Sequence, residues 1–169
     1  MKTVGLFSGI GGLDLPFQKR GIKTELLCDL WEASQSVLSV HFPAAKLHSD
    51  IATLKRLPDG VDVVTAGFPC QDISHAGTRQ GITGARSSLW HAVAAAIGVL
   101  RPGLVFVENV AALRNRGLDR VLADLAAVRY DATWLCLRAS DVGAAHRRDR
   151  LFLLATPTDG SHVADPLRP

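Results

Sequence analysis

The stretch Val4-Gly5-Leu6-Phe7-Ser8-Gly9-Ile10-Gly11-Gly12-Leu13-Asp14 (residues 4–14) is an apolar run, then a glycine-rich turn, then the beginning of a helical segment. Glycines at such a turn allow the backbone to approach a ligand closely. The helix that follows presents free N–H groups, which suit a carboxylate or a phosphate. Taken alone, the turn is equally consistent with a plain structural connection, so its meaning depends on the segments around it.

Further apolar runs of strand length follow along the chain, at 25–28, 61–68, 104–107, 134–137 and 151–155. Between them, 89–100 and 118–128 carry apolar residues at spacings of three and four, which predicts two helices packed on a sheet. This alternation predicts an α/β fold with a doubly wound, mostly parallel sheet. The last two runs are joined by a link around 141–143, too short for a helical crossover, which predicts a terminal antiparallel hairpin.

The bulk composition fits one compact domain. The chain has 169 residues, of which 47% are hydrophobic and 21% charged, enough for one substantial core. We expect the domain to cover 1–156, with a C-terminal tail at 157–169 that begins Pro-Thr-Asp-Gly-Ser-His. No stretch reaches the roughly 18 to 20 apolar residues of a membrane span, so no membrane partner is expected.

The three cysteines, Cys28, Cys70 and Cys136, have neither CxxC nor Cys/His metal spacing. Neither a disulfide framework nor a metal site is therefore predicted, and a reducing cytoplasm is the expected location. The net charge of +3 permits an anionic partner without identifying one. Three arginines gather in 146–150, a pattern that by itself is most typical of a solvated strand edge.

Two carboxylates follow predicted strand ends. Asp29 lies in Cys28-Asp29-Leu30-Trp31, where a carboxylate can accept hydrogen bonds from both hydroxyls of a ribose. Asp50, in Ser49-Asp50-Ile51, suits the amino group of an adenine, with the apolar isoleucine against the ring. Each acid alone is more typical of a surface carboxylate or a helix cap. Together with the glycine-rich turn, they favour a nucleoside cofactor.

Cys70 belongs to Gly67-Phe68-Pro69-Cys70-Gln71, directly after the strand-like run 62–66. A thiol that leaves a buried strand can face a cleft. With a pKa of about 8.5 it needs little activation to become a nucleophile. A lone cysteine is more often a small buried residue, so the neighbouring motifs decide its reading.

These motifs resemble those of the DNA (cytosine-5-)-methyltransferase family. Phe7 to Gly12 is similar to the family's AdoMet loop, and 67–71 to its Pro-Cys nucleophile motif. Residues 108–110 are similar to its Glu-Asn-Val motif and 146–150 to its Gln-x-Arg-x-Arg motif, in the family's order. Residues 71–74 resemble its Gln-x-x-Ser and 81–89 its loop ending in Arg-x-x-Leu. Two positions depart from the pattern: Gly5 stands where an aspartate is common, and His146 where a glutamine is usual.

The resemblance implies the AdoMet-dependent methyltransferase (Rossmann-like) fold, with S-adenosyl-L-methionine (AdoMet) as cofactor and DNA as substrate. The implied cofactor-binding residues are Phe7, Ser8, Gly9, Ile10, Gly11, Gly12, Asp29, Leu30, Asp50, Ile51, Gly67, Pro69 and Leu89. The implied catalytic residues are Cys70, Glu108, Arg148 and Arg150, and the implied substrate contacts are Gln71, Ser74, Arg86 and Asn109.

The implied reaction is methylation of carbon 5 of a flipped cytosine through covalent addition of Cys70 to carbon 6. Glu108 would hold ring nitrogen 3 and the amino group, Arg150 the oxygen, and Arg148 would support the site. The alternative role for Glu108 is a salt-bridge partner in a loop, but its position after a fully apolar strand and within a matching motif favours catalysis. The stretch 71–86 is polar and glycine-punctuated, as expected of a segment that closes over the base.

The resemblance covers the catalytic portion without the family's target recognition region and closing helix. We therefore expect a second polypeptide to supply both. The alternatives are a truncated, inactive AdoMet-binding scaffold and a relative of the tRNA-methylating branch, whose Cys-Phe-Thr signature lies in a region that this sequence lacks.

Overall fold

The computed structural model of the chain describes residues 1–69 and 88–160, and its strands form one seven-stranded sheet. The strands are β1 (Lys2–Leu6), β2 (Lys23–Cys28), β3 (Lys46–His48), β4 (Val63–Ala66), β5 (Leu104–Val110), β6 (Tyr130–Arg138) and β7 (Asp149–Pro157). The helices are α1 (Leu15–Lys19), α2 (Glu32–His41), α3 (Ser88–Leu100) and α4 (Leu118–Ala127), with short 3-10 helices η1 (Ile51–Thr53), η4 (Ala111–Asn115) and η5 (Ala139–Val142).

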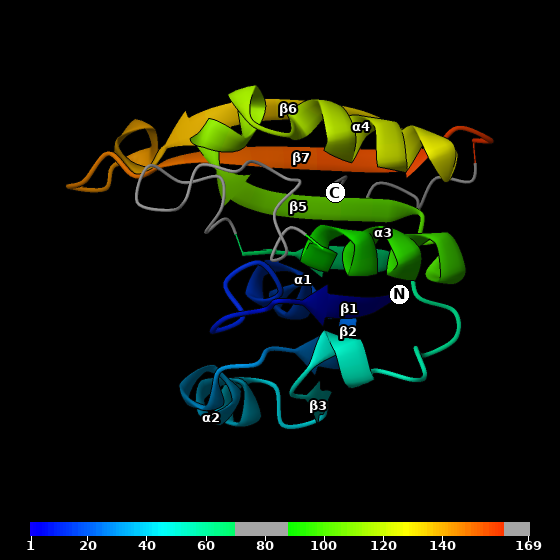
Figure 1. Ribbon diagram of the computed structural model, residues 1–169. Coiled ribbons are helices and arrows are strands. Elements are labelled where there is room, and N and C mark those ends of the chain that lie inside the picture. Colours follow the sequence, from blue (N-terminus) through cyan, green and yellow to red (C-terminus); the bar gives the residue numbers. More distant parts are fainter. Residues whose placement is uncertain (70–87, 161–169) are drawn as a thin grey trace.

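The strand order is β3-β2-β1-β4-β5-β7-β6 (Figure 1). The five strands from β3 to β5 pair in parallel, whereas β7 runs antiparallel between β5 and β6. The predicted mostly parallel, doubly wound sheet with a terminal antiparallel hairpin is confirmed. The order of the strands reverses between β1 and β4, which is where ligands of such sheets bind.

Helices lie on both faces of the sheet. The connections through α1 and α2 lead from β1 toward β3, whereas α3 leads the opposite way, from β4 to β5, so right-handed crossovers place them on opposite faces. In Figure 1, α3 and α4 lie in front of the sheet. Trp90 of α3 donates its indole N–H to Asp124 of α4 at 3.0 Å, which joins this helix pair. No helix within the described ranges is long and apolar enough to cross a membrane.

Burial alternates along β5 and β7. Val105 and Val107 on β5, and Leu151 and Leu153 on β7, are fully buried in the main core. The neighbouring residues of these strands point to the opposite face. On that face Leu135, Leu137 and Leu154 are between 40% and 49% exposed. One face of the β5-β7-β6 portion is therefore apolar and largely uncovered.

Strand β5 is longer than the sequence predicts. The apolar run ends at Val107, but the strand continues to Val110, because β7 pairs with it as far as Val110 opposite Arg150. Glu108 is consequently a strand residue, and the reading of it as a loop residue is wrong. The short strand β3 has no apolar run of its own, yet it pairs with β2 and places Asp50 two residues beyond its end.

Candidate functional site

Backbone hydrogen bonds tie together the carboxyl ends of β1, β2, β3 and β4. The Ser8 N–H donates to the Cys28 carbonyl (3.0 Å), and the Asp29 N–H donates to the His48 carbonyl (3.1 Å). The Gly67 N–H donates to the Leu6 carbonyl at 3.2 Å. Segments far apart in the sequence therefore leave the sheet along one edge, as parallel pairing requires.

The glycine-rich turn has a left-handed backbone at three positions: Phe7 (φ 54°), Gly9 (φ 55°) and Gly11 (φ 84°). This conformation is uncommon for a bulky residue and indicates local strain at Phe7. A Cβ added at Gly9 or Gly12 would meet no atom within 4 Å, so the backbone there is open to a ligand. A Cβ added at Gly11 would lie 2.5 Å from the Phe42 ring.

Asp29 is held in place by two backbone donors. Its Oδ2 accepts from the Gly9 N–H at 2.7 Å, and its Oδ1 accepts from the Trp31 N–H at 3.0 Å. A carboxylate offers about four acceptor positions, so about two remain for the hydroxyls of a ligand. Asp50 likewise accepts from the Ala52 N–H, at 2.9 Å, at the beginning of η1.

A cavity of about 470 Å³ joins these strand ends, a size within the usual range for small-ligand sites. Its lining includes nine of the predicted cofactor residues, namely Phe7, Gly9, Asp29, Leu30, Asp50, Ile51, Gly67, Pro69 and Leu89. Trp31 and Ser34 also line it but were not among the predicted residues. Trp31 could have been found, because it follows Asp29 by two positions and is a large aromatic residue beside a candidate nucleoside carboxylate.

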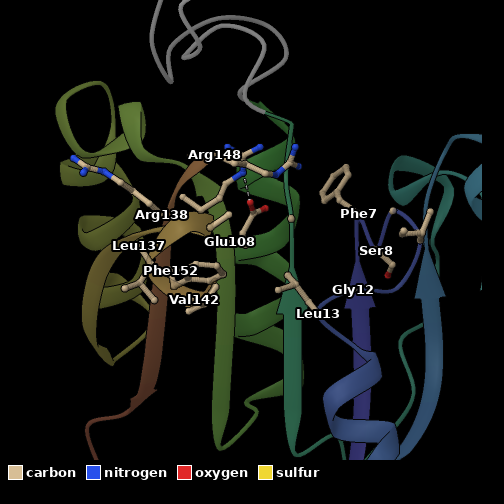
Figure 2. Close-up of a pocket in the computed structure, with 15 residues that line it drawn as sticks. Phe7, Ser8, Gly12, Leu13, Glu108, Leu137, Arg138, Val142, Arg148 and Phe152 are labelled. Atoms are coloured by element: carbon tan, nitrogen blue, oxygen red, sulfur yellow. Dashed lines mark ion pairs between the residues drawn. The ribbon is translucent and has the colours of Figure 1, made fainter. Parts of the chain in front are cut away.

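A second cavity, of about 620 Å³, shares Phe7, Gly9 and Gly67 with the first. Figure 2 shows Phe7 and Ser8 on one side of it and Glu108 and Arg148 on the other. Among the predicted residues it is also lined by Ile10, Gly12 and Arg150. Gly11 is buried and lines neither cavity.

An ion pair occupies the far wall of this second cavity. The Arg150 Nε lies 2.6 Å from the Glu108 Oε1, and both side chains are about three-quarters buried. Arg148 has a left-handed backbone (φ 35°), an uncommon conformation that is found where the structure over-determines a residue. The two arginines and one carboxylate therefore converge on the space opposite the glycine-rich turn.

Asn109 is 2% exposed and its amide is engaged by the backbone. The Nδ2 donates to the Phe68 carbonyl (3.1 Å), and the Oδ1 accepts from the Val110 N–H (2.8 Å). Asn109 thus ties β5 to the segment that follows β4, and its direct substrate contact stays a prediction. Four predicted residues, Cys70, Gln71, Ser74 and Arg86, lie outside the described residues.

Cys28 is the one described cysteine beside the first cavity, and its environment opposes ionisation. Burial, reinforced by the Asp29 and Asp50 carboxylates, raises the pKa of its thiol to about 11. Because the thiolate is the nucleophilic form, Cys28 is inert at neutral pH.

The second cavity has lining residues that sequence reasoning missed. They are Leu13, Leu137, Arg138, Ala139, Val142 and Phe152. Phe152 could have been found, because it follows Arg150 by two positions and shares its face of the strand. Leu137 lies opposite Arg150 across the β6–β7 pair, and that register depends on a link whose course the sequence does not specify.

The groups that line these two cavities fit AdoMet. Open backbone at Gly9 and Gly12, free acceptor positions on Asp29, and a carboxylate at Asp50 meet the needs of a nucleoside with an amino-acid tail. The fold and the site define a class: α/β proteins that bind a nucleoside cofactor where the strand order of the sheet reverses.

The chain belongs to the C-5 cytosine-specific DNA methylase family, whose family model matches residues 1–166. Members of this family use AdoMet as methyl donor. The predicted family and cofactor class are thereby confirmed.

Relatives with established names are similar to most of this chain. The Type II methyltransferase M2.BsuMI of Bacillus subtilis (strain 168) is 36% identical over 164 residues, covering 92% of this chain and 42% of the relative. The Type II methyltransferase M.CviJI of Paramecium bursaria Chlorella virus IL3A is 35% identical over 162 residues, covering 94% of this chain and 44% of the relative. The chain therefore spans less than half the length of these two relatives.

Solved structures share the fold. The Dnmt2 methyltransferase of S. pombe superposes with a TM-score of 0.72 at 20% identity, covering 98% of this chain and 57% of that structure. A Spodoptera frugiperda DNMT2 mutant superposes with a TM-score of 0.72 at 21% identity, covering 94% of this chain and 50% of that structure. At this level of identity the likeness establishes the Rossmann-like methyltransferase fold alone.

Proposed function

We propose that this chain is the catalytic, AdoMet-binding portion of a cytoplasmic DNA cytosine-5 methyltransferase. The observation that carries the proposal is the position of the Glu108–Arg150 pair opposite the glycine-rich turn, across a cavity of about 620 Å³. That cavity shares Gly67 with the cofactor-side cavity, which Pro69, the residue before Cys70, also lines. The proposed cofactor-binding groups, the proposed base-holding groups, and Gly67 and Pro69 of the nucleophile motif line adjoining cavities, which supports the proposal.

The proposed division of labour follows the chemistry of each group. Bound AdoMet would supply an electrophilic methyl group. Carbon 5 of cytosine is a weak nucleophile, so the Cys70 thiolate first forms a bond to carbon 6, which makes carbon 5 electron-rich. After carbon 5 has gained the methyl group and lost its proton, the Cys70–carbon 6 bond breaks and the pyrimidine is restored.

Glu108 and Arg150 would relieve the charge that this addition places on the ring. The Glu108 carboxyl is suited to hold ring nitrogen 3 and the amino group, and the Arg150 guanidinium to hold the oxygen. Their 2.6 Å contact keeps both groups oriented before a base arrives. The target base must leave the duplex, at a cost of a few kcal/mol, and Arg148 would stabilise it in the pocket.

We also propose that a second polypeptide supplies the target recognition region and a closing helix. The uncovered apolar face of β5, β7 and β6 supports this, because a cavity of about 350 Å³ lies on it, lined by Phe106, Phe152, Leu135 and Leu154 among others. Phe152 and Leu137 line both this cavity and the one that holds Glu108. A helix with one apolar face docked there would also wall the active site.

Cofactor binding is tested by calorimetry with AdoMet and with its demethylated product, S-adenosylhomocysteine. We expect Asp29→Ala to weaken binding about 5- to 150-fold, the effect of losing about 1 to 3 kcal/mol from a partly buried, charged hydrogen-bond partner. Asp131→Ala, which changes an exposed acid on the distant strand β6, should bind normally. Absence of heat from the folded wild-type chain would contradict the proposed cofactor site.

The covalent step is tested with DNA that contains 5-fluorocytosine, in the presence of a candidate recognition polypeptide. Fluorine cannot leave as a proton does, so Cys70 should remain joined to the base in a complex that survives denaturation. Cys70→Ser should abolish this complex, and Glu108→Gln should slow its formation while AdoMet affinity is unchanged. A complex that persists in Cys70→Ser would exclude the mechanism.

A further inference from the structure

The carboxyl group of Asp14 occupies space that the glycine at position 5 leaves free. A Cβ at Gly5 would lie 2.5 Å from the Asp14 Oδ1, 2.5 Å from the Ser8 Oγ and 2.7 Å from Leu27. Any larger residue at position 5 would therefore displace this group. Gly5 is also one of the two positions at which the sequence departs from the family pattern, and the space that it leaves holds the buried carboxyl.

Asp14 is completely buried and incompletely satisfied. Its side chain is turned away from α1, whose N–H groups it does not cap, and its Oδ1 accepts from the Thr65 hydroxyl at 2.5 Å. Among the described residues, neither its Oδ2 nor the Ser8 Oγ, both buried, has a hydrogen-bond partner of normal geometry, although the Ser8 hydroxyl lies close enough to lower the pKa of the carboxyl. Buried polar atoms without partners are rare, so each one calls for a specific explanation.

The surroundings of Asp14 favour its neutral form. Burial raises the pKa of its carboxyl to about 6, although the Thr65 and Ser8 hydroxyls and its own backbone N–H act in the opposite direction. No charged group of the described residues contributes to this shift. The titratable groups of the packed elements are Lys2 on β1, Lys19 on α1, and Lys23, Glu25 and Cys28 on β2, while Val63–Ala66 carries none.

The same carboxyl lies directly beneath the cofactor loop, defined as residues 7–12. Ser8 of this loop lines the cavity that holds Glu108, and the adjoining Phe7 and Gly9 line both cavities. Figure 2 shows Ser8 and Leu13, the residue before Asp14, at the wall of that cavity near β1 and α1. A charge on Asp14 would act through protein of low dielectric on any cation held at the junction of the two cavities.

We propose that Asp14, whose carboxyl lies beside Ser8 of the cofactor loop, favours cationic AdoMet over its product, which lacks the sulfonium charge, when this carboxyl is ionised. The inference rests on the proposed cofactor binding and deepens it. AdoMet carries a sulfonium charge that S-adenosylhomocysteine lacks, so the ratio of the two affinities isolates the interaction with that charge. The coupling is reciprocal, so AdoMet should in turn stabilise the ionised form of Asp14.

The test is calorimetry of the wild-type chain with both ligands between about pH 5 and pH 7, where Asp14 changes charge. We expect the ratio of the AdoMet affinity to the S-adenosylhomocysteine affinity to rise about three- to tenfold across this range. The rise is of this size because the attraction between the Asp14 charge and the sulfonium is moderately screened. Asp14→Asn keeps the shape and removes the charge, so its preference should stay flat. Asp131→Asn, an exposed control on β6, should behave as the wild type does.

Two further measurements separate this role from a purely structural one. Carbon-13 NMR of the aspartate carboxyls should show the Asp14 midpoint falling when AdoMet saturates the chain, with a smaller change for S-adenosylhomocysteine. Thr65→Val removes the hydroxyl donor and keeps the carboxyl, so the pH-dependent preference should persist in it. A flat preference in the wild type, or a rise retained in Asp14→Asn, would overturn the inference. Failure of both ligands to bind would instead contradict the proposed cofactor site.

Discussion

At the scale of single residues, the glycines of the cofactor loop differ in whether a side chain could be tolerated. Gly11 combines a left-handed backbone with a close approach to the Phe42 ring, whereas Gly12 has ordinary backbone and open space around it. The glycines of one motif therefore have different physical roles. Gly11 is required for packing against the segment that ends α2, and Gly12 leaves room for a ligand.

We expect Gly11→Ala to lower the free energy of unfolding by about 2 to 4 kcal/mol, from backbone strain together with overpacking. Gly12→Ala should change it by less than about 1 kcal/mol, because its Cβ would meet open space. Urea unfolding of both variants measures the difference. Equal losses in the two variants would contradict this assignment of roles.

Asp14 gives the fold a dependence on pH. The folded-state pKa of about 6 lies above the ordinary aspartate value of 3.8, so the folded chain binds more protons between these values and its stability falls as pH rises through them. Asp14→Asn should remove this dependence and raise stability near pH 7 by up to about 2 to 3 kcal/mol. Thermal unfolding of both proteins between about pH 4 and pH 8 checks this sign; an Asp14→Asn variant that is less stable at neutral pH would contradict it.

The sequence made Asp29 and Asp50 recognisable as candidate site residues, and both line the first cavity; Asp29 follows an apolar strand run, whereas the short strand before Asp50 has none. It did not make Asp14 recognisable. Asp14 has the position of a helix cap, yet its side chain caps nothing and pairs with Thr65, 51 positions away. Contacts between distant strands of this kind have no local signal, and the space that Gly5 leaves becomes visible once the sheet is assembled.

At the scale of elements, β5 connects the core to the cavity wall that carries Glu108. Its first residues were predictable from an apolar run, but its extension through Glu108 and Asn109 depends on pairing with β7, a partner some forty positions later. Within this extension, alternate residues point to opposite faces. Glu108 faces the cavity, and Asn109 points into the core, where it holds the Phe68 carbonyl.

We expect Asn109→Ala to lower the free energy of unfolding by about 1 to 3 kcal/mol, because it leaves the buried Phe68 carbonyl without a donor. Asn115→Ala, at the exposed end of η4, is the matched control and should lie within about 0.5 kcal/mol of the wild type. Urea unfolding measures both. A neutral Asn109→Ala would show that this amide does not hold β4 and β5 together.

At the scale of the whole molecule, the two halves of the sheet differ in how they are covered. Helices lie on both faces of the β1–β4 region, and α3 and α4 cover one face of β5, β7 and β6 (Figure 1). The opposite face of that half carries Phe106 stacked on Phe152, with ring centroids 6.0 Å apart, and exposed leucines beside them. Contiguous apolar surfaces of this kind mark interaction sites.

We expect the isolated chain to bind an apolar fluorescent dye and to self-associate through this face. The double variant Leu135→Glu with Leu154→Glu should reduce both, with little loss of stability, because both side chains are already about half exposed. Val40→Glu and Val99→Glu change isolated exposed valines and serve as controls. Dye fluorescence and sedimentation measure the two effects, and equal dye binding by all variants would locate the apolar surface elsewhere.

The central pairing of β1 with β4 has a consequence for the order in which the molecule folds. Thr3 pairs with Val63, whereas β2 pairs with β1 about twenty positions away and β6 pairs with β7 through a short link. Closing the longer loop costs more chain entropy, so the shorter-range units are expected to form earlier. Gly67 donates its N–H to the Leu6 carbonyl at the end of the β1–β4 pairing, and it lines both cavities. A nascent chain would therefore acquire its ligand site in the final cooperative step, and ligand binding would act as a direct report that folding is complete.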